Sequence, residues 1–193
     1  MTKYPQALVW FDIQTANLPE GNDYSGVEIL EVAAIGTDFD LSPFGGFYST
    51  VKLTPASVGV LKDNEFVLNM HKENGLIEEA KENGLPLDEI EDTIISILQE
   101  KTTFVEGEFE LAGSEVSTWE LPLIREKMPK LYRWLVRYTF DIGNAGRVIR
   151  GLNHGQSIVN STPSKKTNRA SDQVKADILE AKLYQQVLGE NFA

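Results

Sequence analysis

Residues Ala7–Thr15, which read ALVWFDIQT, form an apolar and β-rich stretch that contains a single carboxylate, Asp12. An apolar run of this length predicts a strand buried on both faces, and therefore a central strand of a sheet. A buried carboxylate is costly unless it is paired or bound to a metal ion, which makes Asp12 the first candidate functional residue. A simpler interpretation, in which Asp12 caps a turn at the strand end, fits this stretch alone equally well.

The elements that follow predict an α/β protein. Turn-forming residues separate the first strand from two more, at Val27–Thr37 and Gly46–Leu53, which favours an antiparallel meander. Further along, helical periodicity alternates with two short strands. The expected helices are Asn64–Lys72, Leu87–Gln99, Thr118–Lys127, Asn144–Leu152 and Ser171–Leu188, and the expected strands are Phe109–Ser114 and Tyr138–Ile142. We therefore expect a mixed five-stranded sheet flanked by helices, in one domain that spans residues 1–193.

The composition excludes several classes of protein. The 193 residues include 18 Lys and Arg against 29 Asp and Glu, which gives a net charge of −11. This balance argues against binding to long duplex DNA, but it permits a carboxylate site that takes a short nucleic acid together with divalent cations. No run approaches the ~18 apolar residues of a membrane helix, and the start of the chain lacks the pattern of a signal peptide. We expect a cytoplasmic protein without membrane contact.

Several short motifs then occur in the order in which one nuclease family has them. They include Leu8–Leu18 (LVWFDIQTANL), Ile29–Ala33 (ILEVA), Met70–Glu79 (MHKENGLIEE), Leu111–Gly113 (LAG) and Asn168–Asp172 (NRASD), the last of which resembles a His-x-x-x-x-Asp motif. The chain resembles the oligoribonuclease family of DnaQ-like exonucleases, which carry the DEDDh set of residues. The resemblance implies an RNase H-like fold, a homodimer, and removal of nucleotides from the 3′ end of very short RNAs. It also implies two Mg²⁺ or Mn²⁺ ions held by four carboxylates, with a His that deprotonates the attacking water.

The resemblance matches three positions of this chain to metal-binding carboxylates, and one of them has changed. Asp12 stands at the first carboxylate and Asp172 at the fourth, which makes both candidate catalytic and metal-binding residues. Gln14 stands where the family has Glu. A glutamine can offer an amide oxygen to a metal but adds no negative charge, so we expect metal binding to be weak or absent.

The third carboxylate position is ambiguous from the sequence. Counting forward from Gly113 places it at Trp119, whereas counting back from Met128-Pro129 places it at Glu120. We favour Glu120, because the backward count also aligns the following apolar residues with apolar positions of the family. The alternative for Glu120 is structural, since Ser117 and Glu120 have the spacing of a helix capping box.

The position of the catalytic His is occupied by Asn168. An amide cannot accept a proton at neutral pH, and general-base catalysis contributes about 10²–10⁴-fold to a rate. His154, in a polar stretch nearby, is a conceivable replacement, although a solvated loop histidine is the simpler interpretation.

Three residues match positions that contact the substrate in the family. Leu18 corresponds to a wedging Leu, Phe66 to a base-stacking Trp, and His71 to a His at the substrate end. Stacking on an aromatic ring contributes ~1–3 kcal/mol per base. Core packing is the alternative for Leu18 and Phe66, and a favourable interaction with a helix C-terminus is the alternative for His71.

Three functions remain open at this point. In the first, the active site is degenerate, hydrolysis is lost or very weak, and the chain retains the binding of a short oligoribonucleotide, a nucleotide or a partner. In the second, the chain is an active metal-dependent 3′–5′ exoribonuclease that uses Asp12, Glu120 and Asp172 without the family His. In the third, it is a non-enzymatic interaction or scaffold protein whose cleft is filled by Trp119. The amides of Gln14 and Asn168 favour the first.

Overall fold

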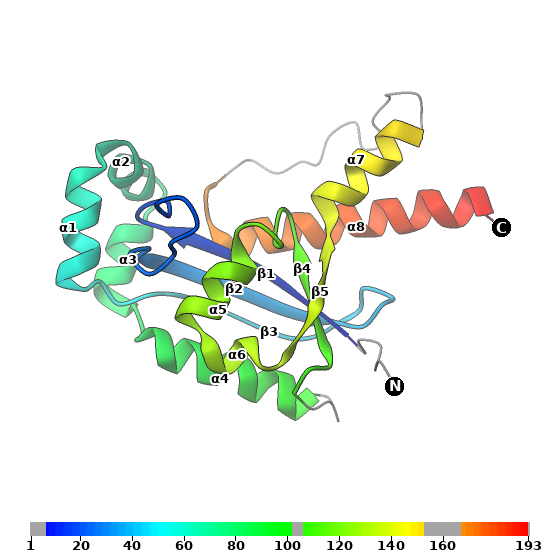
Figure 1. Cartoon of the computed structure of the whole chain (residues 1–193), viewed down its shortest axis with the longest axis horizontal. Coiled ribbons are helices and arrows are strands. Elements are labelled where there is room, and N and C mark those ends of the chain that lie inside the picture. Colours follow the sequence, from blue (N-terminus) through cyan, green and yellow to red (C-terminus); the bar gives the residue numbers. More distant parts are fainter. Residues whose placement is uncertain (1–6, 102–105, 153–166, 193) are drawn as a thin grey trace.

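A mixed five-stranded sheet forms the centre of the computed structural model, which describes residues 7–101, 106–152 and 167–192 (Figure 1). Its strands are β1 (Ala7–Thr15), β2 (Ile29–Thr37), β3 (Pro43–Thr50), β4 (Phe109–Gly113) and β5 (Leu135–Asp141). The spatial order is β3-β2-β1-β4-β5, with β1–β2 and β2–β3 antiparallel and β1–β4 and β4–β5 parallel. The predicted mixed sheet, with its antiparallel meander and its central first strand, is confirmed.

Eight helices surround the sheet in the described part of the chain. They are α1 (Pro55–Asp63), α2 (Glu65–Glu73), α3 (Leu76–Asn83), α4 (Leu87–Lys101), α5 (Glu120–Lys127), α6 (Pro129–Tyr132), α7 (Ile142–Leu152) and α8 (Ala170–Phe192). Helices α1, α3 and the short α6 were not predicted from the sequence. Helix α1 begins at a capping box, in which the backbone N–H of Ser57 donates to the Thr54 hydroxyl (3.1 Å) and that of Thr54 donates to the Ser57 hydroxyl (2.8 Å). None of these helices is long and apolar enough to cross a membrane.

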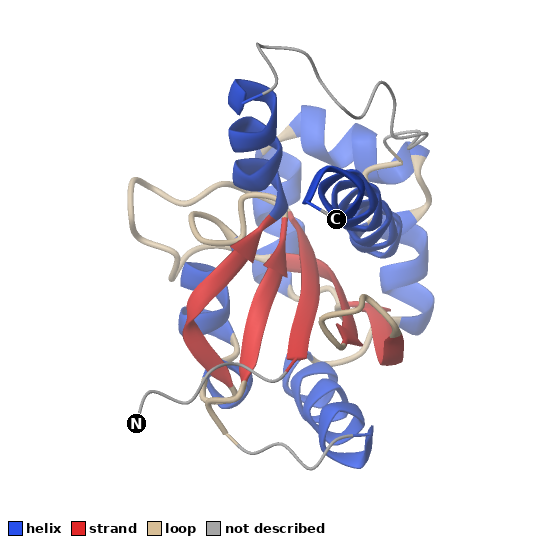
Figure 2. Cartoon of the chain, turned by 90° about the vertical axis from the view of Figure 1, so that its right-hand side faces the viewer, coloured by secondary structure: helices blue, strands red, loops and turns tan. Residues whose placement is uncertain are grey.

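The two faces of β1 belong to different cores. Phe11 and Ile13 belong to the core that includes residues of α4 and α5, whereas Leu8 and Trp10 belong to the core that includes residues of α8. Figure 2 shows helices on both faces of the sheet. Side chains alternate between the faces of a strand, so Asp12 lies on the face that α8 covers. Helices α1, α2 and α3 gather at the C-terminal end of β1 (Figure 1). Asp12 therefore lies where the start of α8 approaches the middle of the sheet.

Candidate active site

Asp12 is a half-buried carboxylate with one polar side-chain partner, Gln14, whose Nε2 donates to its Oδ2 (2.9 Å). Burial raises the pKa of Asp12 to about 7; the hydrogen bond from Gln14 opposes this rise, and the negative charges of Asp177 and Glu31 add to it. A cation at this position would favour the ionised form instead. Burial and the neighbouring negative charges thus outweigh the one hydrogen bond that stabilises the ionised form of Asp12.

Glu120 begins α5 and is only 3% exposed. Its Oε2 has no hydrogen-bond partner, and burial followed by the charge of Asp12 raises its pKa well above the usual range. Trp119, the other candidate for this position, instead packs against Tyr24 with ring centroids 6.1 Å apart. The structure therefore brings Glu120, and not Trp119, into electrostatic contact with Asp12.

The capping-box interpretation of Glu120 is wrong. The N-cap of α5 is Trp119, and no side chain forms a capping hydrogen bond there. The hydroxyl of Ser117 instead reaches Oδ2 of Asp141 (3.4 Å). The burial of Glu120 therefore does not come from a capping role.

On α8, the charge of Asp177, and not that of Asp172, is among those that raise the pKa of Asp12. Asp172 accepts a hydrogen bond from the Thr167 hydroxyl (2.7 Å), its side chain is 46% exposed, and it is absent from the charges that act on Asp12 or Glu120. Asp177 is 2% exposed, and its charge raises the pKa of both Asp12 and Glu120. The structure does not bring Asp172 to the other candidate carboxylates.

Two features of the sequence bear on the positions of Asp172 and Asp177. A His-x-x-x-x-Asp spacing counted from Asn168 ends at Gln173, so matching the motif to Asp172 was one residue short. Gln173 donates its amide to Asp177 (2.7 Å). In addition, Asp177 follows Val174 by three residues and precedes Ala181 by four, which places it on the buried stripe of α8.

Asn168 is exposed and adopts a left-handed conformation (φ 51°), which Asn tolerates better than most residues. Its carbonyl accepts a hydrogen bond from Nδ2 of Asn74 (2.8 Å). The next residue, Arg169, donates to the buried Glu31 (2.7 and 2.9 Å) and to Glu79 (2.6 Å), which ties the start of α8 to β2 and α3. His154, the conceivable replacement for the missing base, lies outside the described residues.

The expected substrate contacts divide into two groups. Leu18 and Phe66 are 73% and 77% exposed, so the core-packing alternative is wrong for both. His71 lies in the last turn of α2 but is fully buried, and neither ring nitrogen makes a hydrogen bond of standard geometry. Burial lowers the pKa of His71, and the backbone of Thr15 opposes that effect. At neutral pH His71 is therefore an uncharged side chain, which removes the helix-dipole argument for it.

Across residues 7–101, 106–152 and 167–192, no three His, Asp or Glu side chains converge closely enough to hold a metal ion among them. Mg²⁺, however, is commonly bound through one or two carboxylates together with waters and substrate phosphates. Asp12 and Glu120 provide such a pair, and the unpartnered Oε2 of Glu120 is an oxygen that a cation would satisfy.

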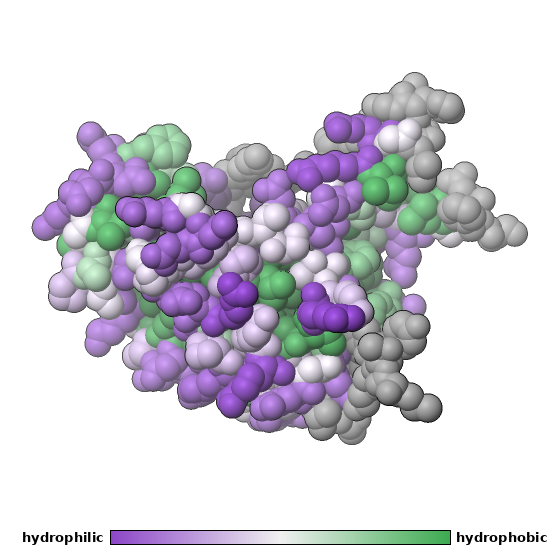
Figure 3. Space-filling view, in the orientation of Figure 1, coloured by the Kyte–Doolittle hydropathy of each residue, from purple (hydrophilic) through white to green (hydrophobic). Residues whose placement is uncertain are grey.

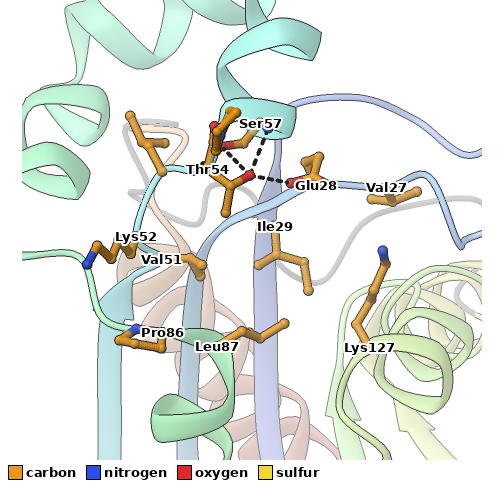
Figure 4. A pocket seen from close by; sticks show the side chains of 12 residues that line it. Val27, Glu28, Ile29, Val51, Lys52, Thr54, Ser57, Pro86, Leu87 and Lys127 are labelled. Carbon is orange, nitrogen blue, oxygen red and sulfur yellow. Dashed lines mark hydrogen bonds between the residues drawn. The ribbon is translucent and has the colours of Figure 1, made fainter.

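A separate pocket of about 470 Å³ opens elsewhere on the molecule (Figure 4). Its apolar lining includes Ile29, Val51 and Leu87, and Lys52 and Lys127 extend beside it. Neither Asp12 nor Glu120 lines this pocket, so it is not the cleft of the carboxylates.

The face seen in Figure 3 is mostly polar, with small apolar patches near its middle and beside α7. Val148 on that helix is 61% exposed.

Comparisons with known proteins agree with the fold. The chain aligns with exonuclease I of E. coli in complex with a dT13 oligonucleotide over 97% of its own length and 42% of that chain, with a TM-score of 0.65 and 15% identity. It aligns with exonuclease I of Methylocaldum szegediense over 94% and 40%, with a TM-score of 0.61 and 19% identity. The fold is therefore that of an RNase H-like, DnaQ-like exonuclease.

Comparison of the sequence with curated proteins finds similarity to oligoribonucleases. No protein-family model matches the chain. The oligoribonuclease of Corynebacterium glutamicum is 33% identical over 144 residues, which cover 74% of this chain and 62% of the relative. The oligoribonuclease of Cutibacterium acnes is 27% identical over 184 residues, or 94% and 85% of the two chains. The chain spans only 62–65% of the first two curated relatives it matches. The chain is therefore similar in sequence to oligoribonucleases and in fold to exonuclease I.

Proposed function

We propose that this chain is an oligoribonuclease-like domain that binds the 3′ end of a short oligoribonucleotide, or a nucleotide, and hydrolyses it very slowly or not at all. The observation that carries the proposal is Asn168. It stands at the position of the family's general base, and its exposed side chain cannot accept a proton. Gln14 stands at a further position that is a carboxylate in the family.

The binding half of the proposal rests on the exposed apolar side chains. Leu18 and Phe66 are available to contact bases, and a Phe ring retains the face on which a base stacks. Asp12 and Glu120 would hold one Mg²⁺ or Mn²⁺ ion, which would neutralise a substrate phosphate and acidify a bound water. Gln14 orients Asp12 through its amide hydrogen bond.

A second function has one observation in its favour. Glu120 is buried and its Oε2 has no hydrogen-bond partner, so this oxygen remains available to an ion in an active metal-dependent 3′–5′ exoribonuclease without the family His. An ion alone lowers the pKa of water substantially. We rank this function second because no side chain described near the carboxylates replaces the missing base.

The remaining expectations form part of the same proposal. We propose that residues 1–193 form a single domain, that the protein is cytoplasmic and homodimeric, and that it contacts neither membranes nor long duplex DNA. The exposed apolar side chains of Val148 and Tyr138 are consistent with a subunit contact near α7.

The test combines binding and cleavage. Fluorescence anisotropy of an end-labelled five-residue RNA should show binding that strengthens with Mg²⁺ or Mn²⁺ and weakens in Asp12→Ala. Single-turnover incubation of the same RNA should give no cleavage, or cleavage at least about 100-fold slower than that of an exonuclease that retains a general base. Rapid cleavage that Asp12→Ala abolishes would establish the second function. Absence of both RNA binding and metal binding would leave the scaffold hypothesis.

A further inference from the structure

The loop between β1 and β2, residues 16–28, is closed at its base by hydrogen bonds. The side-chain amide of Asn17 donates to the carbonyl of Gly26 (3.0 Å), and its oxygen accepts from the backbone N–H of Glu28 (2.9 Å). Leu18, the next residue, is 73% exposed. Compact surface loops whose ends meet in this way frequently carry function. The chain therefore presents an apolar side chain to solvent from a loop with a fixed base.

The far side of this loop is attached to α5 and to the residues just before it. The Tyr24 hydroxyl donates to the carbonyl of Thr118 (2.8 Å), and the Tyr24 and Trp119 rings lie with their centroids 6.1 Å apart. One turn from the end of α5, Lys127 donates from Nζ to the carbonyl of Ser25 (2.5 Å). Figure 4 shows the Lys127 side chain extending away from α5. Contacts between residues about 100 positions apart in the sequence thus hold the loop in place.

Tyr24 joins the loop to the start of the candidate active site. It contacts the two residues that directly precede Glu120, while its own loop carries Leu18. A phenylalanine could pack on Trp119 equally well, so the hydrogen bond is the contact that requires a tyrosine. Binding to a loop that is already held in place costs less conformational entropy than binding to a mobile one.

We propose that Tyr24 is a positioning residue for the 3′ end of the bound oligonucleotide. Its hydroxyl clamps the loop of residues 16–28 to the start of α5 and thereby holds Leu18 where it contacts the terminal bases. Tyr24 itself does not touch the RNA in this arrangement. The inference rests on the proposed function, because it takes from it the contact between Leu18 and a base.

The test compares Tyr24→Phe with the unmodified full chain, using an end-labelled five-residue RNA and Mg²⁺. The variant keeps a ring beside Trp119 and removes the hydrogen bond to Thr118. Fluorescence anisotropy should give a Kd that is raised about threefold to tenfold, as expected for the loss of one net hydrogen bond. The melting temperature should fall by less than about 2 °C, since the bond lies at the surface and the loop can open without the core.

Leu18→Ala separates positioning from other effects of Tyr24. Because Tyr24 acts through Leu18, Tyr24→Phe should change the Kd by less than about twofold in the Leu18→Ala background. Without RNA, amide hydrogen exchange of residues 17–26 should be faster in Tyr24→Phe than in the unmodified chain. Tyr132→Phe is the matched control. It removes a phenol hydroxyl from an exposed ring on α6, and should change neither the Kd nor the exchange.

The outcomes separate failure of the clamp from failure of the proposed function. If Leu18→Ala weakens RNA binding and Tyr24→Phe does not, the inference is overturned and the proposed function stands. An equally large effect of Tyr24→Phe in the Leu18→Ala background also overturns it, because Tyr24 would then act independently of Leu18. Unchanged hydrogen exchange would show that the hydroxyl does not hold the loop. If the unmodified chain binds no RNA, or Leu18→Ala binds it as tightly, the base contact of the proposed function fails and the inference fails with it.

Discussion

Replacing Arg169 with alanine should destabilise the fold by about 3 kcal/mol. The carboxylate of Glu31 is fully buried, and its Oε1 accepts from two nitrogens of Arg169 at 2.9 and 2.7 Å. Breaking a buried ion pair by removing one partner costs about 3–5 kcal/mol, because the other charge stays buried without compensation. The lower end applies here, since Arg169 is 20% exposed and Glu31 Oε2 keeps a hydrogen bond from the backbone N–H of Ala170 (2.7 Å).

Urea unfolding followed by circular dichroism provides the assay. With a slope of about 2 kcal/mol per M of urea, a loss of 3 kcal/mol lowers the midpoint by about 1.5 M. Lys81→Ala is the matched control, because Lys81 pairs with Glu78 on the surface, where such pairs contribute about 0–1 kcal/mol. A midpoint in Arg169→Ala within about 0.3 M of that control would refute the view that Arg169 anchors the start of α8.

Three further predictions concern binding, pH and helix capping. Phe66→Ala should weaken RNA binding by ~1–3 kcal/mol, measured by anisotropy, without changing the melting temperature, because the side chain is 77% exposed; unchanged affinity would exclude stacking on this ring. In metal-free buffer the melting temperature should fall from pH 5 to pH 8, since the folded-state pKa of Asp12 is raised to about 7 and that of Glu120 is also raised. A carboxyl group whose pKa is higher in the folded than in the unfolded state stabilises the fold fully below its unfolded pKa, and this contribution is lost as the pH rises through the folded pKa. Asp12→Asn should therefore flatten the dependence of the melting temperature on pH. A dependence as steep as that of the unmodified chain would show that Asp12 does not cause it. Thr54→Ala should cost about 1 kcal/mol in urea unfolding through loss of the N-cap of α1, and no change would show that the hydrogen bond from Ser57 contributes nothing.

The sheet was predictable because its strands carry strong local patterns. The apolar run of β1 fixes a strand that needs cover on both faces, and the turn residues before β2 and β3 force a meander. Helices α1 and α3 were missed for a physical reason. Helix α1 buries only Ser57 and Leu61 and so shows little apolar periodicity, and α3 starts directly after Gly75 (φ 78°), where the sequence indicates only a chain reversal.

The site was only partly predictable. Asp12 stood out because a charge in a buried strand needs an explanation, and the backward count selected Glu120, which the structure brings beside it. Asp177 did not stand out, because an acidic residue on a helix is usually solvated. Its burial depends on Ser114, 63 residues earlier in the chain, and sequence periodicity does not reveal that contact.

The central claim is that the chain retains an oligonucleotide site but lacks the groups that activate water, and restoring those groups tests it most directly. The double variant Asn168→His and Gln14→Glu should be compared with the unmodified chain in single-turnover cleavage of a five-residue RNA with Mn²⁺, with Asp12→Ala in the double variant as the control. The account predicts acceleration of at least about 100-fold, lost again in the control, because a general base contributes about 10²–10⁴-fold. An unmodified chain that already cleaves as fast as the double variant, in a reaction that depends on Asp12, would contradict it.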